Sequence, residues 1–237
     1  MRKLLIIIIL IMAIFQMVVM AKTITTNGSA QVDTAIVRLG TGSLLGNNNG
    51  YLSVADHADF GFGTGDFTVD YWIKGTGWIA SISNTTNQVS SDCVLAFYTA
   101  SDIMYVYAGG WAALTGAIDN SEWQHVAVVR ASGTMKLYVQ GSEIASVSYT
   151  TNMVSKPLSI GTLYTYTNEF TGNIDEFRIS KGLARWTSGF TPPTSAYSCD
   201  INTHLLVHCD GVDESTNFYD DDTIPSAGNA IFFGINF

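Results

Sequence analysis

The sequence predicts an all-β fold, an antiparallel β-sandwich of the jelly-roll type, and three observations support this. The chain of 237 residues contains 22 glycines and 4 prolines, and 12% of it is aromatic against 13% charged, which suits short strands joined by tight turns. Apolar and polar residues alternate along several segments, as on strands with one buried face. Turn signals separate these segments at short intervals, which is typical of a sandwich.

The clearest alternation runs over residues 67–73, where every second side chain from Phe67 to Ile73 is apolar. Residues 94–98 and 103–107 are expected to pair as a hairpin, because the segment between them has hairpin length and turn chemistry. Residues 123–130 are apolar on both alternating sets, which predicts a central strand covered on two sides.

The second half continues with a meander, because turn signals at 131–134 and 140–142 follow the central strand. Phe170, Ile174, Phe177 and Ile179 alternate imperfectly in the longest of the later strands. The further strands that we expect cover residues 135–139, 144–149, 158–160, 170–180 and 204–208.

Three regions are expected along the chain. Residues 1–21 have a charged start, an apolar run and a small residue at Ala21, which predicts a signal peptide; the alternative is an uncleaved N-terminal anchor. Residues 22–209 form the predicted sandwich. Residues 210–237 form an acidic, polar tail.

The net charge and the cysteine spacing disfavour two kinds of ligand, nucleic acid and zinc. A net charge of -9 disfavours nucleic acid, because phosphates would be repelled. The three cysteines lack zinc-site spacing. Either Cys199 pairs with Cys209, leaving Cys93 buried, or all three are free; the sequence does not decide between these.

Seven blocks, taken in order, resemble LamG-like jelly-roll domains of the concanavalin A-like lectin/glucanase superfamily. The resemblance covers nearly everything from residue 31 to residue 193. At position 140 a glutamine stands where the family usually has aspartate, which should alter only a hairpin turn. The blocks are Leu39–Leu44, Gly50–Val54, Phe62–Ile73, Trp123–Arg130, Leu137–Gly141, Pro157–Gly161 and Phe170–Arg185.

The resemblance also bears on the C-terminal part. Residues 204–211 resemble the segment found before many such domains. This suggests either a truncated second repeat or a strand that completes the sheet of the first domain. We favour the strand, because residues 205–208 are too apolar to remain solvated.

The superfamily includes glycoside hydrolases, so paired carboxylates were sought. The E-x-D-x-x-E pattern of those enzymes is absent. Asp66 and Asp70 are four residues apart and share a strand face, while Asp175 and Glu176 are adjacent and are expected to point in opposite directions. The sequence therefore predicts a protein without catalytic activity.

Among possible metal ligands, Asp175 is the first choice for Ca²⁺, because it matches the aspartate of the Gly-x-Ile-Asp-Glu block of the family. A salt bridge from Asp175 or Glu176 to Arg178 or Arg185 is the favoured alternative.

The histidines are expected to be structural. His125 should be a hydrogen-bonded core residue. His204 and His208 share a strand face that could hold a metal, although packing is favoured.

Sugar recognition needs aromatic faces and polar groups on loops held by a rigid scaffold. Trp78, Trp111, Tyr164 and Tyr166 lie in Gly-, Ser- or Thr-rich stretches and are the candidate ligand-binding residues. Trp72 and Trp123 lie in predicted strands and should pack.

These features predict an exported, non-catalytic recognition module for carbohydrate or a glycosylated surface, secreted or displayed at the cell surface. The alternative is a structural or adhesion component of a cell surface or virion, of the tail-protein type. A glycoside hydrolase is the third option. The expected partners are carbohydrate or a protein; a membrane is expected only through an uncleaved N-terminal segment.

Overall fold

A computed structural model describes residues 21–47, 49–165 and 170–221, which form an antiparallel β-sandwich, as predicted. The signal-peptide prediction lies almost wholly outside these residues. The strands are β1 Ile24–Asn27, β2 Gln31–Asp33, β3 Ser43–Gly46, β4 Tyr51–Val54, β5 Phe67–Ser83, β6 Cys93–Ala100, β7 Ile103–Ala108, β8 Trp111–Ala117, β9 Gln124–Ala131, β10 Thr134–Val139, β11 Ser142–Ser148, β12 Leu158–Ile160, β13 Thr171–Lys181 and β14 Thr203–Val207, with a short 3-10 turn, η1, at Ala58–Phe60.

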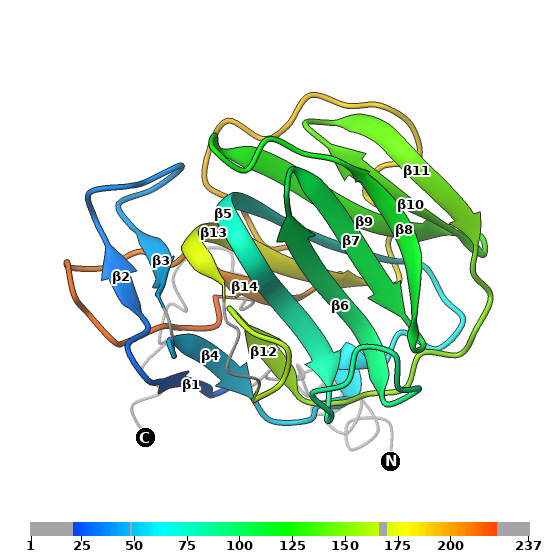
Figure 1. Cartoon of the computed structure of the whole chain (residues 1–237), viewed down its shortest axis with the longest axis horizontal. Helices are drawn as coiled ribbons and strands as arrows, with labels where there is room; N and C mark the ends of the chain where they lie inside the picture. The colour runs from blue at the N-terminus through cyan, green and yellow to red at the C-terminus, as the bar shows by residue number, and fades with distance from the viewer. Residues whose placement is uncertain (1–20, 48, 166–169, 222–237) are drawn as a thin grey trace, which may run out of the picture.

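The strands form two sheets. Sheet A has the order β1-β4-β12-β5-β6-β7-β8. Sheet B has the order β2-β3-β13-β5-β9-β10-β11, and β14 pairs with β13 beyond the end of β3. Figure 1 shows the two layers, with β6, β7 and β8 in front of β9 and β10.

β5 belongs to both sheets. The sequence predicted this strand only as far as Ile73, so its continuation into the second sheet was not expected. Its first part pairs with β9 and β13, and from residue 77 onward it pairs with β6 and β12. Gly75 and Gly172 lie opposite each other at the crossover, with φ of 138° and 134°. A Cβ on either glycine would overlap a carbonyl oxygen of the other strand. Glycine here permits a close approach of two backbones.

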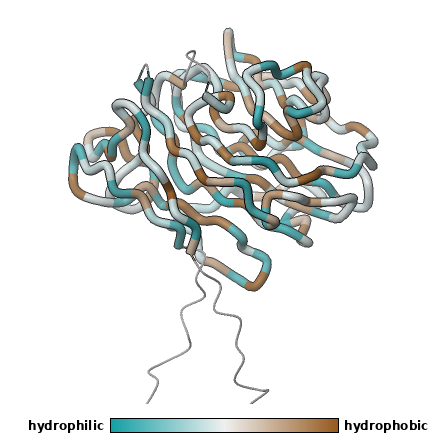
Figure 2. The backbone as a smooth tube through the Cα atoms, turned by 90° about the horizontal axis from the view of Figure 1, so that it is seen from below, coloured by the Kyte–Doolittle hydropathy of each residue, from teal (hydrophilic) through white to brown (hydrophobic). Residues whose placement is uncertain are grey.

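The core lies between the sheets and follows the predicted alternation. Tyr71 stacks on Phe177 and meets Phe97 edge to face, each at a centroid distance of 5.6 Å, so residues from both sheets interlock. In Figure 2 hydrophobic and hydrophilic residues are interspersed along the chain, as alternating strands require.

Two-residue turns join neighbouring strands; three of them lie within expected turn segments, whereas the turn at Gly109–Gly110 and the strand β8 after it were not predicted. The central residues of these turns have positive φ, as in type I′ hairpin turns. The substitution of Gln140 for the usual aspartate leaves this turn type intact, with φ of 49° at Gln140 and 76° at Gly141. The other such turns are Ser101–Asp102, Gly109–Gly110 and Ser132–Gly133.

Residues 182–202 cover the outer face of sheet B. Trp186 and Phe190 pack on β9 and β10, and Tyr197 packs on Trp72. Buried polar groups lie beneath this cover. The guanidinium of Arg178 donates from Nε and Nη2 to the two oxygens of the fully buried Asp70, at 3.0 and 2.8 Å.

The C-terminal strand completes sheet B, because β14 pairs with β13 along residues 203–207. Residues 210–221, the described part of the predicted tail, also bond to the sandwich. Glu214 N donates to Val32 O, Val32 N donates to Ser215 O, and Asp221 N donates to Leu206 O. Whether the chain continues as a second repeat stays a prediction.

Candidate functional site

A β-bulge in β13 builds the polar part of the site. The register of β13 against β5 shifts between Asp175 and Arg178, and Glu176 has a φ of 54°. Ile174 and Phe177 both face the sandwich core, so the two residues between them turn to the outer side. The expectation that Asp175 and Glu176 point in opposite directions was therefore wrong, because it assumed a regular strand.

The bulge aims Glu176 at a histidine. The Glu176 side chain is fully buried and accepts a hydrogen bond from the backbone N–H of Tyr197 at 2.8 Å. Both of its oxygens lie 2.9 Å from Nδ1 of His208. The hydrogen bond to Glu176 raises the pKa of His208, since it favours the protonated imidazole. Glu176 thus fixes the orientation of this ring.

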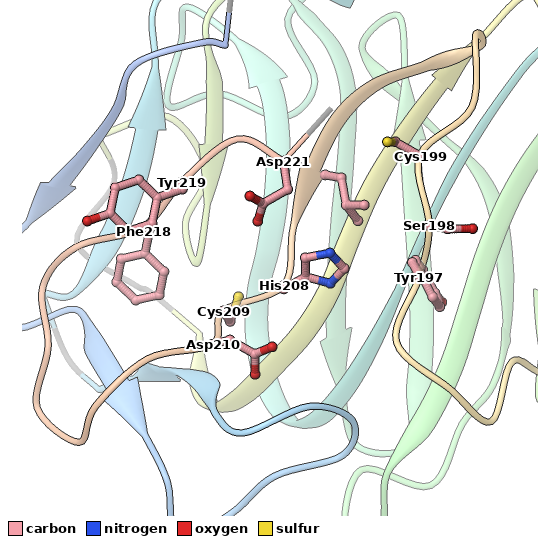
Figure 3. A pocket seen from close by; sticks show the side chains of 10 residues that line it. Tyr197, Ser198, Cys199, His208, Cys209, Asp210, Phe218, Tyr219 and Asp221 are labelled. Carbon is pink, nitrogen blue, oxygen red and sulfur yellow. The ribbon is translucent and has the colours of Figure 1, made fainter. Parts of the chain in front are cut away.

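His208 lines a pocket of about 560 Å³ beside β14, which we call the β14 pocket. Figure 3 shows His208 between the carboxylates of Asp221 and Asp210. Two short segments, residues 197–199 and 218–219, supply further wall. The lining residues are Tyr197, Ser198, Cys199, Leu206, His208, Cys209, Asp210, Phe218, Tyr219 and Asp221.

The two carboxylates at this pocket differ. One oxygen of Asp210 accepts hydrogen bonds from the backbone N–H groups of Thr41 and Gly42, so it holds a loop in place. The carboxylate of Asp221 makes no hydrogen bond within the described residues, and partial burial raises its pKa. Within the described residues, Nε2 of His208 also makes no hydrogen bond, because Glu176 contacts only Nδ1.

Aromatic rings form the apolar part of the wall. Tyr197 is held between Trp72 and the guanidinium of Arg178, which lies 4.2 Å from the ring centroid. Tyr219 is 67% exposed, whereas Phe218 is buried. Hydrogen-bonding groups beside aromatic faces are the combination that a sugar requires.

Asp175, the expected calcium ligand, lies behind this pocket. It is fully buried, and its Oδ2 accepts hydrogen bonds from the backbone N–H groups of Arg38 and Leu39 at 3.2 and 2.9 Å. Burial raises its pKa to about 7. Within the described residues, no group of three or more His, Cys, Asp or Glu side chains is arranged to hold a metal ion. Calcium binding stays a prediction.

The salt bridge favoured for Asp175 or Glu176 does not form. Arg178 is taken by Asp70 across β5 and β13. Arg185 donates instead to both oxygens of Asp200, at 2.8 and 3.1 Å. Burial by itself would raise the pKa of the Asp200 carboxyl group. The hydrogen bond and charge of Arg185 outweigh this effect, and the pKa is lowered to about 2.

The acids weighed for hydrolysis have structural partners. Asp70 lies under the cover of sheet B, where burial raises its pKa and Arg178 more than offsets this, so the net pKa is lowered. Asp66 accepts a hydrogen bond from the backbone N–H of Ser132 at 2.8 Å, in the turn before β10.

Two of the four aromatic candidates lie at the outer face of sheet A. Trp78 was predicted to lie on a loop, and this was wrong. It lies in β5 and is 6% exposed. It packs between Tyr98 and Tyr107, at centroid distances of 4.7 and 5.5 Å. Tyr164 lies in the loop after β12 that passes over this face. Together with Tyr51 it lines a separate hollow.

The other two candidates do not join them. Trp111 is 46% exposed at the start of β8, where it pairs with Ala108 and lies beside Tyr149. Because Ala108 faces the core, Trp111 lies on the opposite side of sheet A from Tyr107. Tyr166 lies outside the described residues.

The histidines and cysteines have structural surroundings. His125 is fully buried, and its Nε2 lies 2.9 Å from the hydroxyl of Tyr197, as expected of a core histidine. His204 bonds to Asp59, at 3.1 Å, so it does not share a site with His208. No disulfide joins any of the three cysteines, so the Cys199–Cys209 pair that the sequence left open does not form.

Comparison with known proteins identifies the family. Residues 45–185, more than half of the chain, match the model of the concanavalin A-like lectin/glucanases superfamily, and the chain belongs to this superfamily. The resemblance noted in the sequence is confirmed. No curated protein matches the sequence.

Solved structures are similar to this chain at low sequence identity. A putative carbohydrate binding protein from Bacteroides ovatus is 14% identical, with a TM-score of 0.53 over 84% of this chain and 58% of that protein. Domain 4 of the arabinanase AbnA from Geobacillus stearothermophilus, in complex with arabinotriose, is 18% identical, with a TM-score of 0.49 over 68% of this chain and 82% of that one. Domains LG4-5 of the mouse laminin alpha1 chain are 13% identical, with a TM-score of 0.42 over 67% of this chain and 47% of theirs.

Among the described residues, no helix is long and apolar enough to cross a membrane.

Proposed function

We propose that this protein is a non-catalytic recognition module that binds carbohydrate, or a glycosylated surface, in the β14 pocket. The observation that carries the proposal is the convergence of two groups on a pocket with aromatic walls: His208, oriented by Glu176, and Asp221, whose carboxylate has no hydrogen bond within the described residues. A buried carboxylate at a strained backbone position is costly, and such strain is often kept at functional sites.

The chemistry of the pocket suits a sugar. The Asp221 carboxylate accepts hydrogen bonds from sugar hydroxyls, and Nε2 of His208 accepts or donates one according to its protonation. The exposed ring of Tyr219 contacts the apolar C–H side of a sugar ring, whereas Tyr197 is buried and shapes the wall. Bound sugar is thus held by directional bonds on one side and by aromatic area on the other.

The partners of the carboxylates support a role in binding rather than hydrolysis. Hydrolysis with retention needs two carboxyl groups about 5 Å apart, flanking the bond to be cleaved. Asp70 is bound by Arg178 beneath a covering segment, and Glu176 is bound by His208 and Tyr197 N. We place the protein outside the cell on the same proposal, since the N-terminal pattern predicts export.

A glycan array probed with the purified protein, with and without added calcium, tests this proposal. We expect binding to at least one class of glycan, and a fall in affinity of about tenfold or more for His208→Ala and for Asp221→Ala, since hydrogen bonds to charged groups contribute about 1.5 to 3 kcal/mol. Asp56→Ala is the matched control, because Asp56 is exposed and distant in the chain from the pocket.

Equal affinity for all three variants would refute the pocket as the site. Absence of glycan binding together with stable self-association would favour the structural role instead. Loss of binding without calcium would revive a metal requirement, and Asp175→Asn would then test its location.

A further inference from the structure

The outer face of sheet A differs from every other large surface of the described chain. None of its strands contains Asp, Glu, Lys, Arg or His, although the protein as a whole is strongly acidic. This holds for β1, β4, β6, β7, β8 and β12 and for the part of β5 that belongs to sheet A, residues 77–83. The face is therefore neutral at any pH near physiological.

Tyrosines occupy this face in a continuous group. Trp78, Tyr98 and Tyr105 are paired in register across β5, β6 and β7, and paired residues of antiparallel strands face the same side. Tyr107 lies two residues beyond Tyr105 on that side. The ring centroids of Tyr98 and Tyr105 are 5.9 Å apart, and those of Tyr105 and Tyr107 are 6.5 Å apart. We call Tyr98, Tyr105 and Tyr107 the tyrosine platform.

The platform is rigid below and open above. Alternate residues of the same strands, such as Phe97 and Val106, are buried in the sandwich core. Trp78, Ala96 and Leu163 are buried and pack against Tyr98 and Tyr107. The three tyrosines are half-buried, and their hydroxyls make no hydrogen bond within the described residues. Three rings with free hydroxyls are thus presented to solvent at fixed spacing.

Hydroxyl groups continue the face toward β1. Thr25, Ser53, Ser159 and Ser81 follow one another in register across β1, β4, β12 and β5. Tyr51 and Tyr164 line a hollow of about 340 Å³ over the same strands. Ser81 and Ser159 are buried, so the hydroxyls that reach the surface on this side are those of Thr25 and Ser53.

We propose that the tyrosine platform is a second glycan-contact surface, separate from the β14 pocket, and that it takes an extended, uncharged polysaccharide. Sugar rings stack their C–H faces on the tyrosines, and the free hydroxyls bond to sugar hydroxyls. A neutral chain fits because the described strands of this face offer no cation to pair with sulfate or uronate and no anion to pair with an amine. This inference extends the proposed function but rests on different residues.

Retention on insoluble polysaccharides tests it. The full chain is mixed with suspensions of cellulose, mannan and arabinan, which are uncharged, and with polygalacturonate, which is acidic. We expect retention on at least one neutral polymer, equal at low and high salt because no ion pair contributes. The triple variant Tyr98→Ser, Tyr105→Ser, Tyr107→Ser should bind at least about tenfold more weakly.

Three further variants make the outcome decisive. Trp111→Ala removes an exposed aromatic side chain on the other side of the same sheet and should retain full binding. His208→Ala should lose array binding but keep retention, so failure of the β14 pocket is distinguishable from failure of the platform. If the triple variant does not fold, Tyr105→Ala replaces it in the retention assay. This single change should disturb the fold less, because Tyr105 touches only Tyr98 and Tyr107 among the aromatic rings described.

Unchanged retention of the folded triple variant would overturn the proposal. So would retention on polygalacturonate alone, retention on none of the neutral polymers, or a loss caused by Trp111→Ala that equals the loss caused by the tyrosines.

Discussion

The outer faces of the two sheets carry opposite chemistry, although both belong to one sandwich. On sheet B the face holds charged groups, including Asp70, Arg178 and Glu176, and residues 182–202 cover most of it. On sheet A the face is uncharged and is covered only in part, by Leu163 and its neighbours. The covered face buries its charged groups against partners and carries the β14 pocket at one end, whereas the open face presents partly exposed tyrosines.

The covering segment explains why charges are tolerated on sheet B. A buried ion pair is stable only when its geometry is good and its remaining atoms are bonded. Arg178 meets this condition through two bonds to Asp70 and through the Tyr197 ring stacked above it. Sheet A lacks such a cover and also lacks charged strand residues. Four measurements of stability test this difference between the two sheets.

The largest expected effect is at the ion pair of sheet B. Arg178→Met leaves Asp70 buried without its guanidinium partner, with only Nε2 of His125 nearby at 3.7 Å, which should cost about 3 to 5 kcal/mol in the free energy of unfolding. Urea denaturation measures it. The double variant Asp70→Asn, Arg178→Met should cost less than Arg178→Met alone. A cost of the single variant below about 1 kcal/mol would mean that the pair behaves like a surface pair.

A pH-dependent effect is expected from Asp175. Its pKa in the folded state is raised to about 7 from an ordinary value of 3.8. The stability that it contributes is therefore fully present below about pH 4 and is lost as the pH rises to about 7, on the order of 3 to 4 kcal/mol. Asp175→Asn does not titrate and can still accept the two backbone hydrogen bonds. The stability of the native protein relative to this variant should fall over that range; a constant difference would contradict the assignment.

The crossover between the sheets should be sensitive to a single methyl group. Gly172→Ala places a Cβ against the carbonyl oxygen of Lys74 at a φ of 134°, so we expect a loss of at least about 2 kcal/mol. Thermal unfolding measures it. Gly189→Ala is the control, because Gly189 has room for a Cβ. Equal melting temperatures for the two variants would show that β5 and β13 can separate at little cost.

The smallest effect is expected on sheet A. The hydroxyl of Ser81 donates to Thr162 O at 3.3 Å and accepts from Tyr164 N at 2.9 Å, which holds the loop over this face. Ser81→Ala should cost about 1 kcal/mol, because only neutral hydrogen bonds are lost. Denaturation at several pH values measures it. A cost as large as that of Arg178→Met would remove the contrast between the two faces.

Sequence patterns identified most strands but not how far β5 extends. Residues 75–77 contain two glycines and indicated a loop, so Trp78 was expected on that loop. In the structure Gly75 meets Gly172, almost a hundred positions later, and the strand continues. A local pattern cannot distinguish a glycine in a turn from one at a close approach of two backbones.

The candidate site shows the same limit. The bulge at Glu176 had a signal, since Ile174 and Phe177 are three positions apart where regular alternation gives two or four. The partners of Glu176 had none, because Tyr197 and His208 reach it from separate segments. The platform was missed because Tyr98, Tyr105 and Tyr107 were interpreted only as strand residues.

Alternation and turn chemistry are local properties of the chain, so they were enough to predict the sandwich, and the order of seven sequence blocks indicated the family. The tertiary structure alone decided which face is covered, where Glu176 points and which aromatic rings meet. Those outcomes depend on pairing between segments far apart in the chain, and burial by a distant segment sets the chemistry of each face.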